Sequence, residues 1–131
     1  MPHARDRLEL TTLGHLAKLP NVRRLDGDTK RRLEAQAQVV KALAHPTRLF
    51  LVEELSNKEY CVCELTEMVG ADMSTVSKHL SMLRAAGIVQ SEKRGQQVFY
   101  RLQMPCALEF FSCASAVLIG NATESLEAVA D

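Results

Sequence analysis

Apolar residues recur at helical spacing between about residues 29 and 56. This spacing predicts two helices, at about 29–44 and 46–56. His45-Pro46 separates them, because the residue before a proline is pushed out of the helical region and a proline suits the first turn of the next helix. Asp28 is the predicted N-cap of the first helix. One face of that helix carries four apolar residues: Leu33, Ala37, Val40 and Ala44.

A β-favouring segment and two short helices come next. Residues 59–62 favour a short strand, and 63–69 favour a helix. After a tight turn at 70–72, a second helix is predicted from Ser74, a natural N-cap, to about Ala86, where Gly87 stops it. Its inner face is formed by apolar residues spaced by four and three: Val76, Leu80 and Leu83. Two short helices joined by such a turn are typical of a helix-turn-helix motif.

A hairpin and a last helix complete the pattern. Residues 88–93 and 97–102 are predicted to be strands joined by a turn at Arg94-Gly95-Gln96. A final helix over about 105–119 is rich in apolar residues and poor in charge. A helix of that composition should be buried, most simply against a second copy of itself.

The order of these elements predicts a mainly α (α+β) winged helix-turn-helix fold. We expect five or six helices, a two-stranded wing and a homodimer formed through the terminal helices. The predicted organisation is an N-terminal arm (1–28), the winged-helix domain with its dimerisation helices (29–120) and a C-terminal tail (121–131). Winged helices pair the short strand before the third helix with the returning wing strand, which would bring Leu102 alongside 60–62.

Composition places the chain among ordinary globular proteins. It has 131 residues, 47% of them hydrophobic, and no apolar run near the roughly 20 residues that a membrane span needs. The first residues do not begin a signal peptide, so a cytoplasmic protein without a membrane partner is expected. No glycine-rich phosphate loop and no hydrolytic metal motif is present, so we do not expect an enzyme.

Charge is balanced over the whole chain but not along it. The 16 basic and 16 acidic side chains cancel, yet residues 71–101 hold five Lys/Arg against two Asp/Glu, an excess of +3. A neutral protein can still present a basic face to phosphates, so the charge pattern permits DNA binding without establishing it.

Candidate DNA contacts lie on the second helix of the motif and on the wing. A recognition helix enters the major groove by its N-terminal end, with short polar side chains against bases and phosphates, and the tip of a wing suits the neighbouring backbone. First-turn amides of that helix also favour a phosphate. The candidates are Ser74, Thr75, Ser77, Lys78 and His79 on the helix, and Lys93, Arg94, Gln96 and Gln97 on the wing.

Five short runs in this sequence resemble the ArsR/SmtB family of metalloregulators. The resemblance covers about 35–104, in order and without gaps. The runs are Lys41-Ala42-Leu43-Ala44-His45-Pro46-Thr47-Arg48-Leu49, Tyr60-Cys61-Val62-Cys63-Glu64-Leu65, Ser74-Thr75-Val76-Ser77-Lys78-His79-Leu80, Leu83-Arg84-Ala85-Ala86-Gly87-Ile88-Val89 and Val98-Phe99-Tyr100-Arg101-Leu102. The resemblance implies a homodimeric repressor that binds double-stranded operator DNA with an inverted repeat, and that leaves it when a metal or metalloid ion binds.

The resemblance also implies that Cys61 and Cys63 are thiolate ligands. The sequence departs from the family's arsenic pattern at Thr66, where that pattern has a third cysteine. The cadmium and lead pattern takes cysteines from the N-terminal arm, which has none here. The zinc pattern pairs His with carboxylates along the last helix, and residues 105–131 contain no His.

The chemistry of the cysteines suggests where a third ligand would come from. Two cysteines two positions apart point the same way at a strand end or a helix start, and a helix N-terminus favours the thiolate form. Thiolates prefer soft ions, and arsenite or antimonite takes three of them. Our hypothesis is an As(III) or Sb(III) site of Cys61, Cys63 and Cys106, with Cys113 as an added ligand or a substitute for Cys106.

Other readings remain open at this point. The same thiolates would also serve a Cd, Pb or Zn sensor, or a thiol redox or persulfide sensor that responds to peroxide or polysulfide without metal. From a different class, the chain would be a winged-helix module that binds protein rather than DNA, for which a flat salt dependence is expected.

Overall fold

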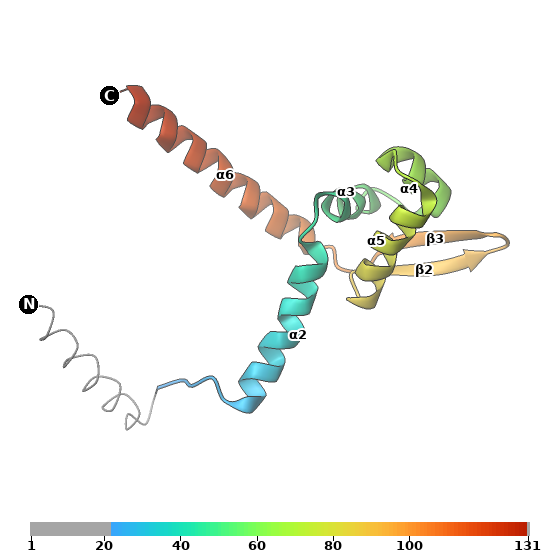
Figure 1. Ribbon diagram of the computed structural model, residues 1–131, viewed down its shortest axis with the longest axis horizontal. Coiled ribbons are helices and arrows are strands. Elements are labelled where there is room, and N and C mark those ends of the chain that lie inside the picture. Colours follow the sequence, from blue (N-terminus) through green and yellow to red (C-terminus); the bar gives the residue numbers. More distant parts are fainter. Residues whose placement is uncertain (1–21, 131) are drawn as a thin grey trace, which may run out of the picture. The chain divides into compact units, whose positions relative to one another are not determined.

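The computed structural model describes residues 22–130, which contain five helices and three strands (Figure 1). The helices are α2 (Gly27–Leu43), α3 (Pro46–Leu55), α4 (Val62–Val69), α5 (Met73–Ala85) and α6 (Ala107–Ala130). The strands are β1 (Tyr60–Cys61), β2 (Val89–Arg94) and β3 (Gln97–Leu102). The chain divides into two units with a boundary between Glu34 and Ala35, inside α2. Residues 35–120 of the predicted winged helix-turn-helix domain therefore lie in the second unit, and residues 29–34 lie in the first.

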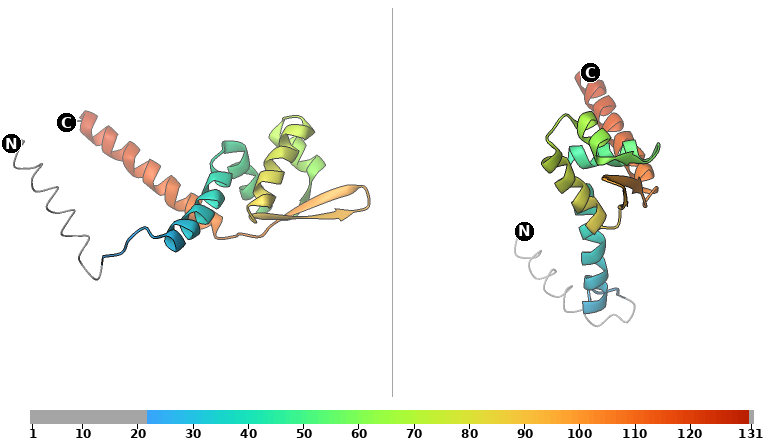
Figure 2. Two further views of the ribbon diagram at one scale, coloured as in Figure 1. Left: turned by 60° about the horizontal axis from the view of Figure 1, so that its bottom comes forward. Right: turned by 90° about the vertical axis from the view of Figure 1, so that its right-hand side faces the viewer.

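The strands form one antiparallel sheet in the order β1-β3-β2. β2 and β3 make the predicted hairpin, which extends beyond the helices as a wing (Figures 1 and 2). Arg94 pairs with Gln97, so the turn has two residues, and Gly95 takes a positive φ of 65° that glycine adopts without strain.

The short strand β1 pairs with β3, as expected, but in a different register. Tyr60 lies opposite Tyr100, and Cys61 lies opposite Phe99. Leu102 therefore lies two residues beyond the partner of Tyr60, and the expected position of Leu102 beside 60–62 was wrong. The pattern of apolar residues defines which strands pair, but a two-residue strand carries too little pattern to define where they pair.

The predicted N-caps of two helices are corrected by the structure. The Asp26 carboxylate accepts a hydrogen bond of 2.7 Å from the Thr29 amide, so Asp26 rather than Asp28 caps α2. Asp72 rather than Ser74 caps α5. In both cases the helix begins earlier than predicted, because an Asp two residues upstream is as good an acceptor for the first amides as the residue chosen from sequence.

The hydrophobic core lies between α3, α4, α5 and the sheet. The predicted inner face of α5 is confirmed, since Val76, Leu80 and Leu83 are fully buried. They pack with residues from the other elements: Leu51, Val52, Leu55, Leu65, Ile88, Val89 and Tyr100. Met68 of α4 is 40% exposed. The core thus holds α5 by one face and leaves the opposite face to solvent.

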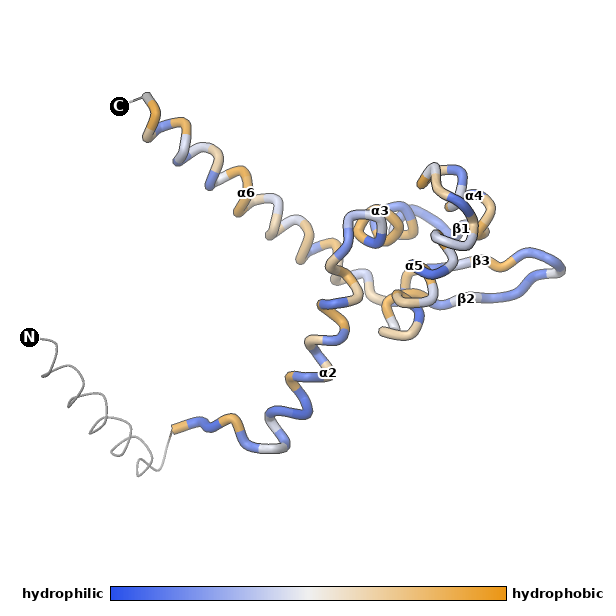
Figure 3. Tube along the Cα trace, in the orientation of Figure 1, coloured by the Kyte–Doolittle hydropathy of each residue, from blue (hydrophilic) through white to orange (hydrophobic). Residues whose placement is uncertain are grey.

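Two apolar surfaces are not covered by the residues that the structure describes, 22–130. On α2, Leu33 and Val40 from the predicted apolar face are exposed, and the core instead takes Ala42 and Leu43 at the end of that helix. On α6, only Ala107 is buried. Figure 3 shows hydrophobic residues recurring along the whole of α6. The largest exposed apolar residues of this helix are Phe110, Val117, Leu118, Ile119, Leu126 and Val129.

The last helix is longer than the sequence suggested. It continues past the predicted end near Ile119 to Ala130, so residues 121–130 belong to the same helix. The division into an arm, a central domain and a tail stays a prediction, and residues 1–21 of the arm lie outside the described part. Within residues 22–130, no helix combines the length and apolar character that a membrane crossing requires.

Candidate DNA interface and cysteine site

The exposed face of α5 carries the first group of predicted DNA contacts. Ser74, Thr75 and Lys78 are exposed and Ser77 is half-buried. Their placement follows from the core, because burial of the opposite face of the helix orients these positions outward. The helix therefore presents short polar groups and one cation along its N-terminal half, where a recognition helix meets base edges.

An aspartate occupies the N-terminus of this recognition helix. The Ser74 hydroxyl donates to the Asp72 carboxylate, and the Thr75 hydroxyl donates to it at 2.7 Å. These two hydroxyl donors, more than any other cause, lower the pKa of Asp72 from 3.8 to about 2. The Thr75 amide also donates to the Asp72 carboxylate, at 3.3 Å. The first turn of α5 is thus occupied by a carboxylate, so a phosphate would have to displace it.

His79 is placed differently from the other candidates on α5. Its ring lies against the ring of His45, with 4.4 Å between centroids, and its Nδ1 lies 3.1 Å from Nη1 of Arg48. Arg48 is buried. Burial lowers the pKa of His79, and the nearby His45 and Arg48 lower it further. These contacts direct the imidazole toward the α2–α3 junction, so His79 serves to position α5 within the domain.

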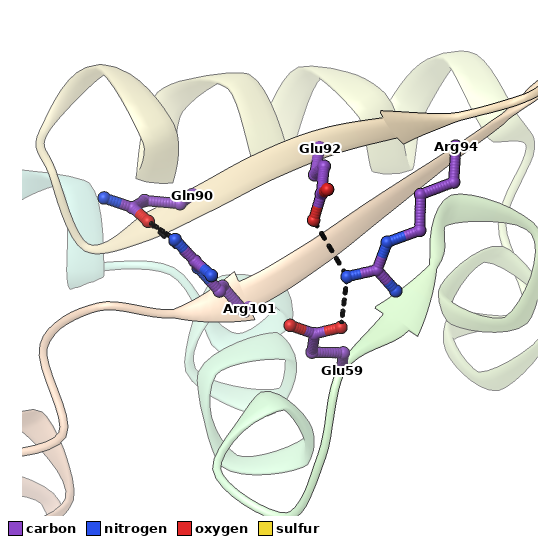
Figure 4. Close-up of polar contacts among 5 residues, drawn as sticks. All are labelled: Glu59, Gln90, Glu92, Arg94 and Arg101. Carbon is purple, nitrogen blue, oxygen red and sulfur yellow. Dashed lines mark hydrogen bonds and ion pairs between the residues drawn. The ribbon is translucent and has the colours of Figure 1, made fainter.

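The wing carries the remaining candidates. Lys93, Gln96 and Gln97 are exposed around the turn. Arg94 is also exposed, but its guanidinium bonds to the carboxylates of Glu59 and Glu92, both at 2.8 Å (Figure 4). Glu92 and Glu59, in that order, raise the pKa of Arg94. Within the described part of the chain, Lys93 forms no ion pair with a carboxylate, whereas Arg94 is engaged by two.

The cysteine pair spans the junction between β1 and α4. Cys61 ends the strand and caps the helix, and its sulfur accepts a hydrogen bond of 3.5 Å from the Glu64 amide. Cys61 is buried whereas Cys63 is exposed in the first turn of α4. The strand-to-helix junction expected for this pair is thus present, but the two thiols have different surroundings.

The structure does not gather this pair with the predicted third ligand into a metal site. Cys61 lies opposite Phe99 of β3, Cys63 lies in α4, and Cys106 follows the end of β3. Cys106 and Cys113 are exposed near and on α6. Among residues 22–130 of one chain, no three His, Cys, Asp or Glu side chains are gathered in a geometry that would hold a metal ion.

Three residues that shape the site were not singled out from the sequence. Nε of Arg48 donates to the carbonyl of Ala42 at 2.6 Å, and Nη1 of Arg48 contacts His79. Glu59 accepts from Arg94, which lies 35 residues later in the chain. Such contacts depend on the tertiary fold and leave no local pattern. Asp72 did have a signal, since an Asp that follows a tight turn and precedes Ser and Thr is a good N-cap.

Known proteins resemble this chain over the same region. Residues 45–91 match the family described as bacterial regulatory protein, arsR family. The biofilm growth-associated repressor of Xylella fastidiosa is 40% identical over 75 residues, which are 57% of this chain and 66% of that protein. The arsenic resistance transcriptional regulator ArsR1 of Pseudomonas putida is 38% identical over 82 residues, which are 62% of this chain and 64% of that protein.

Solved structures agree with this similarity. The transcriptional repressor BigR from Xylella fastidiosa matches 69% of this chain and 92% of its own chain, with a TM-score of 0.58 and 34% sequence identity. The chain spans between about half and two thirds of the length of the curated relatives that it matches first. The match confirms the winged helix-turn-helix fold that the sequence predicted.

Proposed function

Because this chain belongs to the arsR family of bacterial regulatory proteins, we propose that it is a dimeric transcriptional repressor whose cysteines sense the inducer. It binds an inverted-repeat operator in double-stranded DNA and leaves it when Cys61 and Cys63 are engaged. The observation that carries this proposal is the division of α5 into a fully buried face and an exposed face with Ser74, Thr75 and Lys78.

The apolar surface of α6 supports a homodimer. At about 100° per residue, Phe110, Leu118, Ile119 and Leu126 fall on one half of the helix circumference. All four are more than half exposed in the single chain. A contiguous apolar surface of this kind marks an association site, and a two-fold dimer buries the same surface on both copies. Two copies also supply two recognition helices, which an inverted repeat requires.

We propose a soft ion as the inducer, with arsenite or antimonite first and cadmium, lead or zinc as the alternative. Thiolates are soft ligands. Because residues 22–130 of one chain do not gather three possible ligands, we propose that the third thiolate comes from a second copy of the chain, from its Cys106 or its Cys113. Binding then joins the β1–α4 junction of one protomer to α6 of the other.

The link to DNA is thermodynamic. An ion that binds the free protein more tightly than the DNA-bound protein weakens DNA binding by the same factor. Clearing an operator requires the affinity for DNA to fall by about 10²- to 10⁴-fold. The β1–α4 junction lies one short helix before α5, so a shift there is passed to the recognition helix through the shared core residues Leu65 and Leu80.

A second candidate is a thiol redox or persulfide sensor. It is favoured by the exposure of Cys63 beside the buried Cys61, since an accessible thiol next to a second thiol is open to oxidation and then to disulfide formation. This sensor would respond to polysulfide or peroxide without any metal ion.

DNA release tests the proposal. Reduced protein is bound under anaerobic conditions to a fluorescent fragment of its own promoter and titrated with arsenite, antimonite, cadmium, lead or zinc. Release at micromolar arsenite or antimonite that is lost in Cys63→Ser supports metalloid sensing, and Thr66→Ser is the matched control. Release by cadmium, lead or zinc alone changes the inducer, and release by polysulfide alone favours the redox sensor. Absence of DNA binding at any salt concentration refutes the regulator and favours a protein-binding module.

A further inference from the structure

Arg94 links the wing to the strand that carries Cys61. It is the last residue of β2, and its guanidinium bonds to Glu92 on the same strand and to Glu59, which directly precedes β1 (Figure 4). The bond to Glu59 joins residues 35 positions apart in the chain. One side chain therefore connects the outer end of the hairpin to the start of the segment Tyr60–Cys61.

A second contact of Arg94 leads to the same place. Its guanidinium carbon lies 4.7 Å from the centre of the Phe99 ring. Phe99 is the β3 residue opposite Cys61 on one side and opposite Glu92 on the other. The cation thus lies over the residue that pairs with Cys61. The ion pair reaches Glu59, just before β1, and the ring contact reaches Phe99 of β3, which pairs with β1.

These contacts compete with a role in DNA binding. Two carboxylates hold the guanidinium, so a DNA phosphate would have to displace both of them. Other exposed polar side chains lie around the turn, and within the described residues they form no ion pair with a carboxylate: Lys93, Gln96 and Gln97. The wing therefore has other polar groups that can contact the DNA backbone, and Arg94 is placed to hold the wing against β1.

We propose that Arg94 is a positioning residue that couples the wing to the Cys61 strand through Glu59 and Phe99, so that displacement of Cys61 also displaces the wing. The coupling itself depends only on the contacts of Arg94 within the fold. Its consequence for DNA release rests on the proposed function. Glu92 offers a matched comparison with Glu59, because its bond to Arg94 stays within the hairpin whereas that of Glu59 crosses to β1.

Alkylation of the buried thiol tests the coupling without DNA. In a Cys63→Ser background, the rate of N-ethylmaleimide addition to Cys61 is measured by mass spectrometry relative to exposed Cys113. Glu59→Gln and Arg94→Ala should each raise the relative rate about two- to fivefold, the scale of a partly exposed ion pair, and the double variant should raise it no further. Glu92→Gln should leave it within about 1.5-fold, which is below that range. Equal rates in all variants overturn the proposal.

DNA binding separates positioning from phosphate contact. If Arg94 positions the wing, Arg94→Ala leaves the slope of log affinity against log salt unchanged, and Glu59→Gln reduces the arsenite-induced loss of affinity as Arg94→Ala does. If Arg94 binds phosphate, its loss reduces the slope by about one and Glu59→Gln tightens DNA binding, which overturns the proposal. Wild-type protein that ignores DNA or arsenite refutes the proposed function, and the alkylation rates then still decide whether Arg94 is coupled to Cys61.

Discussion

Nη1 of Arg48 lies 3.1 Å from Nδ1 of His79, and this contact ties α3 to the recognition helix α5. A guanidinium has only donors, so Nδ1 of His79 is the acceptor and its ring proton is on Nε2. Nε of Arg48 also donates to the carbonyl of Ala42 at 2.6 Å. The orientation of α5 thus depends on one buried cation and on a neutral imidazole beside it.

Acid should weaken this contact by protonating His79. Burial, then His45, then Arg48 lower the pKa of His79 from its usual 6.5. A group with a lowered pKa in the folded state contributes stability that is present above pH 6.5 and is lost as the pH falls through the folded value. We expect the difference in unfolding free energy between wild type and His79→Gln, measured in urea, to shrink between pH 7.5 and about 5.5. Parallel pH profiles for the two proteins would refute this.

Replacing Arg48 should destabilise the fold. Arg48→Met keeps much of the buried volume but leaves the Ala42 carbonyl and the His79 nitrogen without their donor. We expect a loss of about 1–3 kcal/mol in the free energy of unfolding, measured by denaturant titration. Arg84→Met, at an exposed position on α5, is the control and should change it by less than about 0.5 kcal/mol. Equal losses in the two variants would contradict the role given to Arg48.

The cap of α5 should depend on Asp72 rather than on Ser74. Asp72→Ala removes the acceptor of the Thr75 amide and of both hydroxyls, so we expect a lower Tm, whereas Ser74→Ala should have a smaller effect. The pKa of Asp72 falls from 3.8 to about 2 on folding, so its contribution is present above pH 3.8 and is lost as the pH approaches 2. Thermal melts at pH 7, 4 and 2 measure this. A larger effect of Ser74→Ala at pH 7 would restore the cap predicted from sequence.

A charge on the apolar half of α6 should break the dimer. Leu118 is 69% exposed in the single chain, and Leu118→Glu would bury a carboxylate between two copies. We expect the dimer dissociation constant to rise at least about tenfold in sedimentation equilibrium, since residues at the centre of an interface dominate its affinity. Thr123→Glu, on the other half of the same helix, is the control. An unchanged dissociation constant in Leu118→Glu would exclude this face of α6 from the interface.

The elements of the fold could be predicted because each leaves a local pattern. Val76, Leu80 and Leu83 identified α5 and its buried face, and the turn at Gly95 identified the wing. The register of β1 could not be predicted, since two residues carry no periodic pattern. The exposed apolar residues Val40 on α2 and Leu118 on α6 could only be expected as parts of an interface, because no described residue of the single chain buries them.

The candidate site was predicted less well than the fold. Ser74, Thr75 and Lys78 do lie on the exposed face of α5, because burial of the opposite face fixes their direction. His79 and Arg94 were chosen as DNA contacts because both are polar residues in exposed elements, and that choice stays a prediction. Their partners within the chain could not be foreseen. Their partners, Arg48 and Glu59, are 31 and 35 residues away, and such pairings follow only from the tertiary structure.

The four cysteines differ in how freely they can be exchanged. Cys61 belongs to the strand, to the helix cap and to the buried interior at once, whereas Cys63, Cys106 and Cys113 are exposed and outside the core. Substitution at an exposed position away from a buried network usually changes stability by less than about 0.5 kcal/mol. Mutation can therefore add, move or remove three of the thiols while the winged-helix scaffold stays intact. On this scaffold, descendants of one ancestor can acquire different chemical signals without rebuilding the domain.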